Sequence, residues 1–400
     1  MMPTESAFLL AGLLFVAAAL GYFFARFGES EDDQASTDRL NADYLKGINY
    51  VLNEEPDRAV ELFTRMAELD DEALETHFAL GSLFRKRGEV DRAIRVHQNL
   101  MARPSLSQMQ KIQAEAALAE DYLSAGLFDR AESLFQKLSE SPDFRVQALK
   151  RLIRIYEVTR EWTQAIETTA ELEAADSMSA GSIGRPSMVA HYYCELAEEA
   201  RAAKDYATAR ELLGQAESGR HRTVRSVLAR ADLARDSGKK EDAIRLYRKV
   251  VEASPELLVE VIPRLAACYV AVERAPEFTE YLRKLIDGDE DNAAAIAMAT
   301  VLDTQIKDPV AMEALHRFVA ADAKLAGLVD VKHLESADDS ERLEILDRIR
   351  RALKNVVSGT PSYRCDQCGY ASLVLQWQCS GCRSWETVKP ANRINLVSTV

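Results

Sequence analysis

The sequence predicts an all-α protein with a membrane-spanning helix at its amino end and a small metal-binding module at its carboxyl end. Three patterns support this: an uncharged run near the start, an alanine that returns at a nearly fixed interval, and four cysteines within the last 40 of the 400 residues. We divide the chain into a short tail (1–6), a membrane helix (7–25), a juxtamembrane linker (26–43), helical repeats (44–356) and a metal module with a tail (357–400).

Residues 7–25 contain no charged side chain and, as a helix rising 1.5 Å per residue, are long enough to span the hydrocarbon core of a bilayer. A cleaved signal peptide is the competing interpretation, but it would need basic residues before the apolar run, and residues 1–6 have none. Basic residues follow the run instead, at Arg26, Arg39 and Lys46. This distribution predicts a retained single-pass anchor with a periplasmic N-terminus and the bulk of the protein on the cytoplasmic side.

An alanine recurs through the middle of the chain at intervals of 34, 38, 34, 44 and 34 residues. The alanines are Ala59, Ala93, Ala131, Ala165, Ala209 and Ala243. A 34-residue period is that of the tetratricopeptide repeat, a pair of antiparallel helices that stacks on its neighbours into a superhelix. The two longer intervals indicate insertions, one near 103–107 and one within 177–187, which by composition is a flexible loop.

Other positions of the repeat are present in part. Aromatic residues lie nine positions before the alanine or four after it, where they would fill the wedge between neighbouring helix pairs: Tyr50, Phe84, Tyr122, Tyr156, Phe63, Phe135 and Tyr247. Leu80-Gly81 and Leu118-Ala119 supply a small residue where the two helices of one repeat approach most closely. From Leu257 onward the helical periodicity continues without this signature, so we expect eight or nine helical pairs, the later ones degenerate.

A final amphipathic helix precedes the cysteines. Its expected apolar face comprises Leu343, Leu346, Ile349, Leu353 and Val356. The short segment Ser358-Gly-Thr-Pro361 follows it. A connection this short should hold the metal module against the last helices.

The four cysteines form two Cys-x-x-Cys turns, Cys365-Asp-Gln-Cys368 and Cys379-Ser-Gly-Cys382. Two such turns supply the four sulfurs of a tetrahedral structural metal site. Zinc is physically favoured, although iron fits the same ligands. Two disulfides would need an oxidising compartment, and a thioredoxin-like motif would need a βαβ pattern, which is missing. Four aromatic residues would build a miniature core for the module: Tyr363, Tyr370, Trp377 and Trp385.

No pattern for catalysis is found, and we expect no catalytic residues and no enzymatic activity. The chain contains neither a Gly-rich phosphate loop nor an H-E-x-x-H motif. Its six histidines are scattered along the repeats, and each is interpreted as a packing or surface residue. Cys194 and Cys268 lie in apolar helical runs and are interpreted as small core residues. The net charge of −14 argues against nucleic acid as a partner of the whole protein.

Together the anchor, the repeats and the cysteine-containing ending of the chain resemble the lipopolysaccharide assembly protein B family, LapB. That ending is Tyr363-Arg-Cys-Asp-Gln-Cys-Gly-Tyr370 … Trp377-Gln-Cys-Ser-Gly-Cys-Arg-Ser-Trp385-Glu-Thr-Val-Lys-Pro390. The family's rubredoxin-like or zinc-ribbon ligands map onto Cys365, Cys368, Cys379 and Cys382. One departure lies in the second turn. Ser380-Gly381 follows the first cysteine where rubredoxin has a proline, and Arg383 stands where rubredoxin has a glycine. That departure keeps the four thiolates but weakens the case for redox-active iron.

The resemblance implies an inner-membrane regulator of lipopolysaccharide synthesis. Such proteins are adaptors for the membrane-anchored AAA+ protease FtsH and promote degradation of the deacetylase that commits the precursor to lipid A. The implied partners are therefore that protease, the deacetylase and other lipopolysaccharide assembly proteins. The alternative is a rubredoxin-like electron carrier whose repeats dock a membrane partner. No sequence pattern singles out the residues that bind partners.

Overall fold

The computed structural model describes residues 17–18, 22, 42–53, 55–69, 74–176, 186–218, 223–303, 305–321, 338–357 and 362–390. The predicted membrane helix at 7–25 lies outside these ranges except for residues 17, 18 and 22, which are helical. Within the part of the chain that is described, no helix combines the length and the apolar character needed to cross a bilayer.

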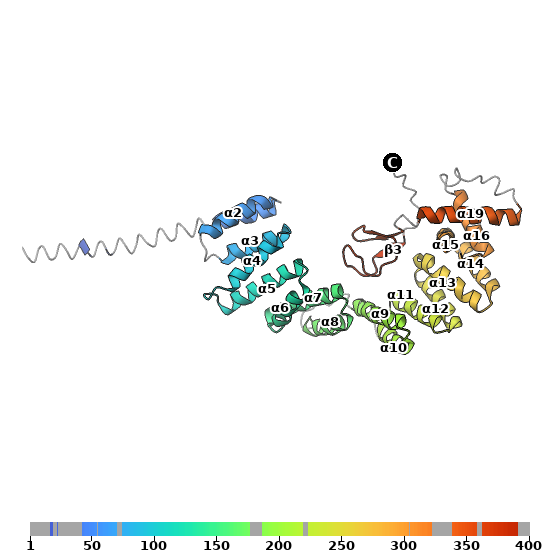
Figure 1. Cartoon of the computed structure of the whole chain (residues 1–400), viewed down its shortest axis with the longest axis horizontal. Helices are drawn as coiled ribbons and strands as arrows, with labels where there is room; N and C mark the ends of the chain where they lie inside the picture. Colours follow the sequence, from blue (N-terminus) through green and yellow to red (C-terminus); the bar gives the residue numbers. More distant parts are fainter. Residues whose placement is uncertain are drawn as a thin grey trace, which may run out of the picture. The chain divides into compact units, whose positions relative to one another are not determined.

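The chain divides into two compact units, residues 1–159 and 160–400 (Figure 1). In the first unit a helix over residues 42–52 precedes six others. These are α2 (Pro56–Leu69), α3 (Leu74–Lys86), α4 (Val90–Met101), α5 (Gln108–Ser124), α6 (Phe128–Ser139) and α7 (Pro142–Thr159). From α2 to α7, each helix packs on the next one along the chain.

The second unit continues the helical array and ends in a small sheet. Its helices are α8 (Trp162–Asp176), α9 (Pro186–Ala202), α10 (Tyr206–Ala216), α11 (Val224–Asp236), α12 (Lys240–Ala253), the 3-10 turn η1 (Pro255–Leu257), α13 (Leu258–Ala271), α14 (Ala275–Gly288), α15 (Glu290–Leu302), α16 (Pro309–Ala321) and α19 (Asp339–Val357). Three antiparallel strands follow: β1 (Tyr363–Cys365), β2 (Ala371–Ser372) and β3 (Val388–Pro390).

The repeating alanines confirm the tetratricopeptide interpretation. All six have no exposed surface, because each lies where a larger side chain would separate two packed helices. Gly81 shows how close this approach is. A methyl group there would lie 2.5 Å from Cε1 and Nε2 of His97, on the second helix of the same repeat.

The first expected insertion is ordered, and most of the second lies outside the described residues. Ser107 ends the first insertion and begins α5 with a capping box, in which its hydroxyl accepts from the amide of Gln110 and its own amide donates to the Gln110 side chain. Leu106, just before the cap, is buried. Of the loop predicted within 177–187, residues 177–185 are not described, and its last two residues, Pro186 and Ser187, belong to helix α9 instead.

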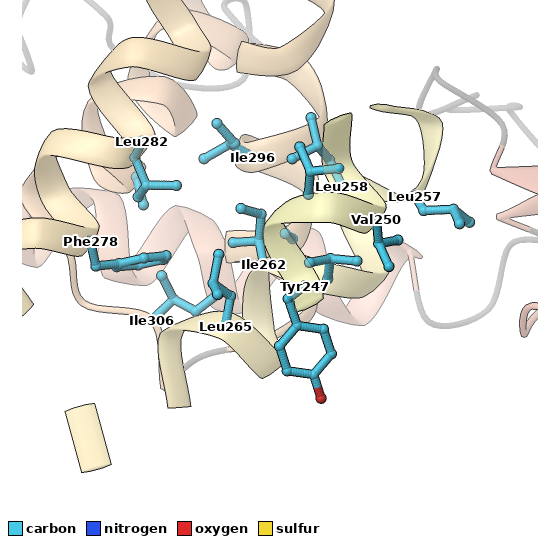
Figure 2. Packing of buried hydrophobic residues seen from close by; sticks show 14 of the residues in the cluster. Tyr247, Val250, Leu257, Leu258, Ile262, Leu265, Phe278, Leu282, Ile296 and Ile306 are labelled. Atoms are coloured by element: carbon cyan, nitrogen blue, oxygen red, sulfur yellow. The ribbon is translucent and has the colours of Figure 1, made fainter. Parts of the chain in front are cut away.

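The later repeats lack the signature but keep a continuous apolar core. Figure 2 shows side chains from α12, η1, α13, α14 and α15 converging on it, among them Tyr247, Ile262, Leu265, Phe278 and Ile296. The expected helical pairs after Leu257 are therefore present as α13–α14 and α15–α16.

The predicted apolar face of α19 is buried only in part. Leu346 and Leu353 are buried, whereas Leu343, near the start of the helix, is 47% exposed. Arg350 is buried as well, at 3% exposure, and its guanidinium donates to the carbonyl of Ile306 at 2.8 Å. The long arginine stem packs like an apolar side chain while its head satisfies a backbone acceptor.

Candidate metal centre and its contact with the repeats

The metal module is built on the three-stranded sheet, in the order β2-β1-β3. Cys365 ends β1, and its amide donates to the carbonyl of Tyr370 at 2.8 Å, which closes the first Cys-x-x-Cys turn. The second turn is closed in the same way, since the amide of Cys379 donates to the carbonyl of Ser384 at 2.9 Å. Each turn therefore presents two thiols on one side of a tight loop.

The structure brings all four predicted ligands together. The Sγ atoms of Cys365, Cys368, Cys379 and Cys382 lie within 4.8 Å of one another. Across the two turns, Cys365 Sγ is 3.7 Å from Cys382 Sγ, and Cys368 Sγ is 3.6 Å from Cys379 Sγ. A tetrahedron of sulfurs about 2.3 Å from a central ion has edges of about 3.8 Å. The four thiols therefore fit one metal ion.

The cysteine pairs are not disulfides. All six cysteines of the chain are free, and separations of 3.6 and 3.7 Å far exceed the roughly 2.05 Å of an S–S bond. Cys194 and Cys268 are buried core residues of helices α9 and α13, as their apolar helical runs predicted.

Neighbouring polar groups favour the thiolate form, which a metal requires, at Cys365 and Cys382. The hydroxyl of Thr387 lies 3.3 Å from Cys365 Sγ, and this hydrogen bond lowers the pKa of that thiol to about 6. Hydrogen bonding with Ser384 lowers the pKa of Cys382. At Cys368 the amide of Tyr370 lowers the pKa, but desolvation and the other three thiols outweigh it and raise the pKa to about 11. The amide of Gly381 points at Cys379 Sγ from 3.4 Å.

Both turns end in a left-handed residue, but only one of them is glycine. Gly369 has φ of +73° and Arg383 has φ of +62°, and each donates its amide to the carbonyl of the first cysteine of its turn, at 2.9 Å. The arginine that replaces the glycine of rubredoxin thus adopts the glycine conformation, at a cost of about 1–2 kcal/mol.

Only Tyr363 of the four aromatic residues belongs to the miniature core that we expected. The small core contains Tyr363, Val388 and two of the cysteines. Tyr370 is 39% exposed, and Trp377 and Trp385 face the helices of the array. The prediction therefore holds for Tyr363, whereas the rings of Trp377 and Trp385 contact side chains of the repeats.

Trp385 inserts among aromatic side chains of α8 and α9. Its ring stacks on the imidazole of His191 with centroids 4.7 Å apart and planes inclined by 11°. It also meets Trp162 and Tyr192 edge to face, at 6.4 and 5.9 Å. Such pairs contribute about 0.5–1.5 kcal/mol each beyond the area they bury.

Arg225, near the start of α11, connects the module to two repeats. Its guanidinium carbon lies 5.6 Å from the ring centres of both Trp377 and Trp385. The same group donates to Glu195 at 2.7 Å and to the carbonyl of His191 at 3.4 Å, both on α9. Because the side chain is only 8% exposed, these cation–π contacts are largely desolvated and worth about 2 kcal/mol.

A third contact reaches α13, where the hydroxyl of Tyr363 donates to the carboxylate of Glu260. The short connection after α19 led us to expect the module against the last helices. Instead its hydrogen bonds and ring contacts with the array go to helices α8, α9, α11 and α13. Sequence distance to α19 was a poor guide because aromatic and charge complementarity determine where the module packs.

At neutral pH the imidazole of His191 in this contact is uncharged. Burial, and then the positive charge of Arg225, lower the pKa of His191 to about 3. Burial raises the pKa of Glu386. His191 Nε2 lies 3.5 Å from Glu386 Oε1, but with a neutral imidazole this contact is not an ion pair. Glu386 itself has φ of +59°, which turns the chain immediately after Trp385.

Sequence reasoning identified the four ligands but missed the residues that receive the module. His191 was interpreted as packing, which is its role, but its partner was not foreseen. Trp162 and Arg225 were not considered for this contact. The available signal was that the chain has only three tryptophans, of which two flank the second cysteine pair.

Comparisons with known proteins agree with this architecture. Residues 363–390 match a family model described as a rubredoxin metal-binding domain, and residues 76–106, 116–179 and 194–257 match tetratricopeptide repeats. The chain is 34% identical to lipopolysaccharide assembly protein B of Escherichia coli K12 over 96% of its own length and 97% of the relative's. It is 31% identical to the Haemophilus influenzae protein of the same name, covering 96% and 98%.

Among solved structures, it is similar to the C-terminal part of a tetratricopeptide-repeat protein from Cytophaga hutchinsonii. The identity is 13% and the TM-score 0.39, with 71% of this chain and 98% of that chain covered.

Proposed function

The chain belongs to the lipopolysaccharide assembly protein B family, and from that premise we propose that it is a non-enzymatic adaptor that regulates lipid A synthesis. In this proposal the repeats bind protein partners, and the anchor at 7–25 holds them at the cytoplasmic face of the inner membrane. The partners are an FtsH-type protease and the deacetylase that commits the precursor to lipid A. The adaptor promotes proteolysis of that deacetylase.

One structural observation supports a scaffold over a mobile carrier. The metal module is fixed to the repeats by a stacked ring pair, a buried arginine between two indoles, and the hydrogen bond of Tyr363. A module held in this way extends the binding surface of the array with a defined geometry. Confinement to the membrane would add to it, because two partners on one surface meet at a raised effective concentration.

The metal ion serves structure in this proposal. Zinc on four thiolates needs no redox partner, and it would hold the two turns that carry Trp377 and Trp385. Metal analysis of the purified chain, with an optical spectrum before and after dithionite, tests this assignment. A coloured site that dithionite reduces reversibly would favour the electron-carrier alternative.

The deciding experiment measures how fast the deacetylase is degraded. After translation is stopped in the native host, the deacetylase should disappear quickly in cells with the protein and persist in cells depleted of it. A plasmid copy should restore the fast decay, whereas a copy that lacks residues 357–400 should not. An unchanged decay rate after depletion would contradict the adaptor proposal.

A further inference from the structure

A groove of about 500 Å³ lies between helices α10, α11 and α12, which follow one another in the second unit (Figure 1). Each helix turns one face toward it, because the lining residues of one helix recur at the spacing of a helical face. On α12 they are Asp242, Arg245, Leu246 and Lys249. The groove is therefore formed by the regular packing of two neighbouring repeats.

The groove lies on the other side of α11 from the metal module. The module contacts Arg225, and Leu228 and Asp232 on the same face of α11 line the space beside it. Arg230 and Ala234 line the groove and come two positions later, which is about 200° around the helix. No described residue of the module lines the groove, so it stays open while the module is docked.

The groove is basic although the net charge of the protein is −14. Its cationic side chains outnumber its carboxylates five to two, and both carboxylates already pair with an arginine of the groove, Glu217 with Arg230 and Asp242 with Arg245. The other three cations are exposed, and no carboxylate of the described residues lies within ion-pair distance of them: Arg210, Lys239 and Lys249. Such a surface attracts an anionic ligand.

The unpaired cations are distributed along the groove. Lys239 precedes the first turn of α12 and Lys249 lies in its third turn, about 15 Å further on at 1.5 Å per residue. Arg210 is on a different helix, α10. A single phosphate group would meet only part of this charge. An extended peptide covers about 15 Å in five residues, and its alternate side chains lie on one face, so a row of carboxylates fits the distribution better.

We propose that this groove binds an acidic, extended segment of a protein partner. The inference rests on the proposed function only in that the array binds proteins, and it assigns to that binding a face and a partner chemistry. Carboxylates at alternate positions of the segment would pair with Lys239 and Lys249 along α12, and with Arg210 across the groove. Because these side chains are exposed, the interaction should weaken as salt is added.

The test uses the full-length protein in nanodiscs of a zwitterionic lipid, so that the bilayer carries no net charge. The probe is a fluorescent peptide of alternating glutamate and alanine, about eight residues long, which is long enough to follow the groove. A peptide with glutamine in place of glutamate is the neutral comparison. Fluorescence anisotropy should show salt-sensitive binding of the acidic peptide and at least tenfold weaker binding of the neutral one.

A triple variant removes the unpaired cations: Arg210→Gln, Lys239→Gln and Lys249→Gln. Its affinity for the acidic peptide should fall about tenfold, because three exposed ion pairs are lost. The matched control makes the same change in composition and charge at exposed positions of α5 and α7: Lys111→Gln, Lys150→Gln and Arg154→Gln. The control should bind like the unchanged protein, and all three proteins should have the same circular dichroism spectrum.

Equal affinity of the two triple variants for the acidic peptide would overturn the site, as would failure of the unchanged protein to bind that peptide. Displacement of the peptide by pyrophosphate at equal total charge would overturn the acidic segment in favour of a phosphorylated ligand. Each of these results would leave the adaptor proposal intact, because the decay of the deacetylase tests that proposal separately.

Discussion

Three side chains hold the metal module in place, and each is positioned by a different element. Trp385 comes from the second cysteine turn, His191 from α9 and Arg225 from the first turn of α11. Arg225 matters most because its planar group contacts two indoles while bonding to two acceptors on α9. Lysine cannot reproduce this, since its point charge has no flat face and no forked donors.

Replacing Arg225 with Lys should therefore loosen the module without unfolding the array. All three tryptophans of the chain lie at this contact, so their emission should shift to longer wavelength as the rings become hydrated. Arg230→Lys, on the exposed face of the same helix, should leave the spectrum unchanged. An unshifted spectrum for Arg225→Lys would show that the guanidinium is not needed for docking.

Two glycines inside helices should respond oppositely to alanine. Gly81→Ala should destabilise the protein by about 1–3 kcal/mol, because the new methyl group would collide with the His97 ring. Gly214→Ala should stabilise it by about 0.5–1 kcal/mol, because no atom lies within 4 Å of the new group and alanine favours the helix. Urea unfolding followed by circular dichroism measures both, and a shared sign would contradict the packing described.

The buried His191 predicts an acid-sensitive fold. In the unfolded chain it takes up a proton near pH 6.5, whereas in the folded protein its pKa is about 3. Between these values the unfolded state binds more protons, so lowering the pH from 6.5 costs stability, about 2 kcal/mol at pH 5. The raised pKa of Glu386 acts in the opposite direction and offsets part of this loss.

His191→Phe keeps an aromatic ring against Trp385 but removes the titrating group. Its melting temperature should fall less between pH 7 and pH 5 than that of the unchanged protein. If the melting temperature of the unchanged protein and that of His191→Phe fall by the same amount between pH 7 and pH 5, His191 is excluded as the acid-sensitive residue.

At the scale of elements, the two cysteine turns have different structural roles. The first turn connects β1 to β2 within the sheet. The second turn positions Trp377 and Trp385. Gln378 and Trp385 form an isolated antiparallel β-bridge, and the amide of Glu386 donates to the carbonyl of Trp377 at 2.8 Å. A metal ion on the four thiols would therefore couple its own binding to the docking of the module through the second turn.

Replacing Cys365 or Cys382 with Ser should therefore unfold the module and free Trp377 and Trp385. A structural zinc site contributes on the order of 10 kcal/mol, far more than this small core provides. The repeats should stay helical, because each is stabilised chiefly by its neighbours. Metal content, far-ultraviolet circular dichroism and deacetylase decay together check this. A variant that keeps one equivalent of metal and normal regulation would show that these thiols are not the site.

At the scale of the whole molecule, folding and regulation should be separable. No described core residue belongs to the segment before residue 27, so deleting residues 1–26 should leave a folded array with its metal. Deacetylase decay should nevertheless slow markedly, because the shortened protein is no longer concentrated at the membrane. Full activity of the truncated protein at normal abundance would argue against co-localisation as the mechanism.

The sequence by itself determined the repeats and the metal ligands, because both depend on local spacing. An alanine every 34 residues can be buried in every repeat, and a Cys-x-x-Cys turn brings its two sulfurs together whatever surrounds it. Tertiary structure alone decided where the module docks, that Arg350 of α19 is buried while Leu343 is exposed, and that Arg225 contacts two indoles. These contacts join residues 30 to 194 positions apart, and their geometry arises only when the stacked helices bring their side chains together.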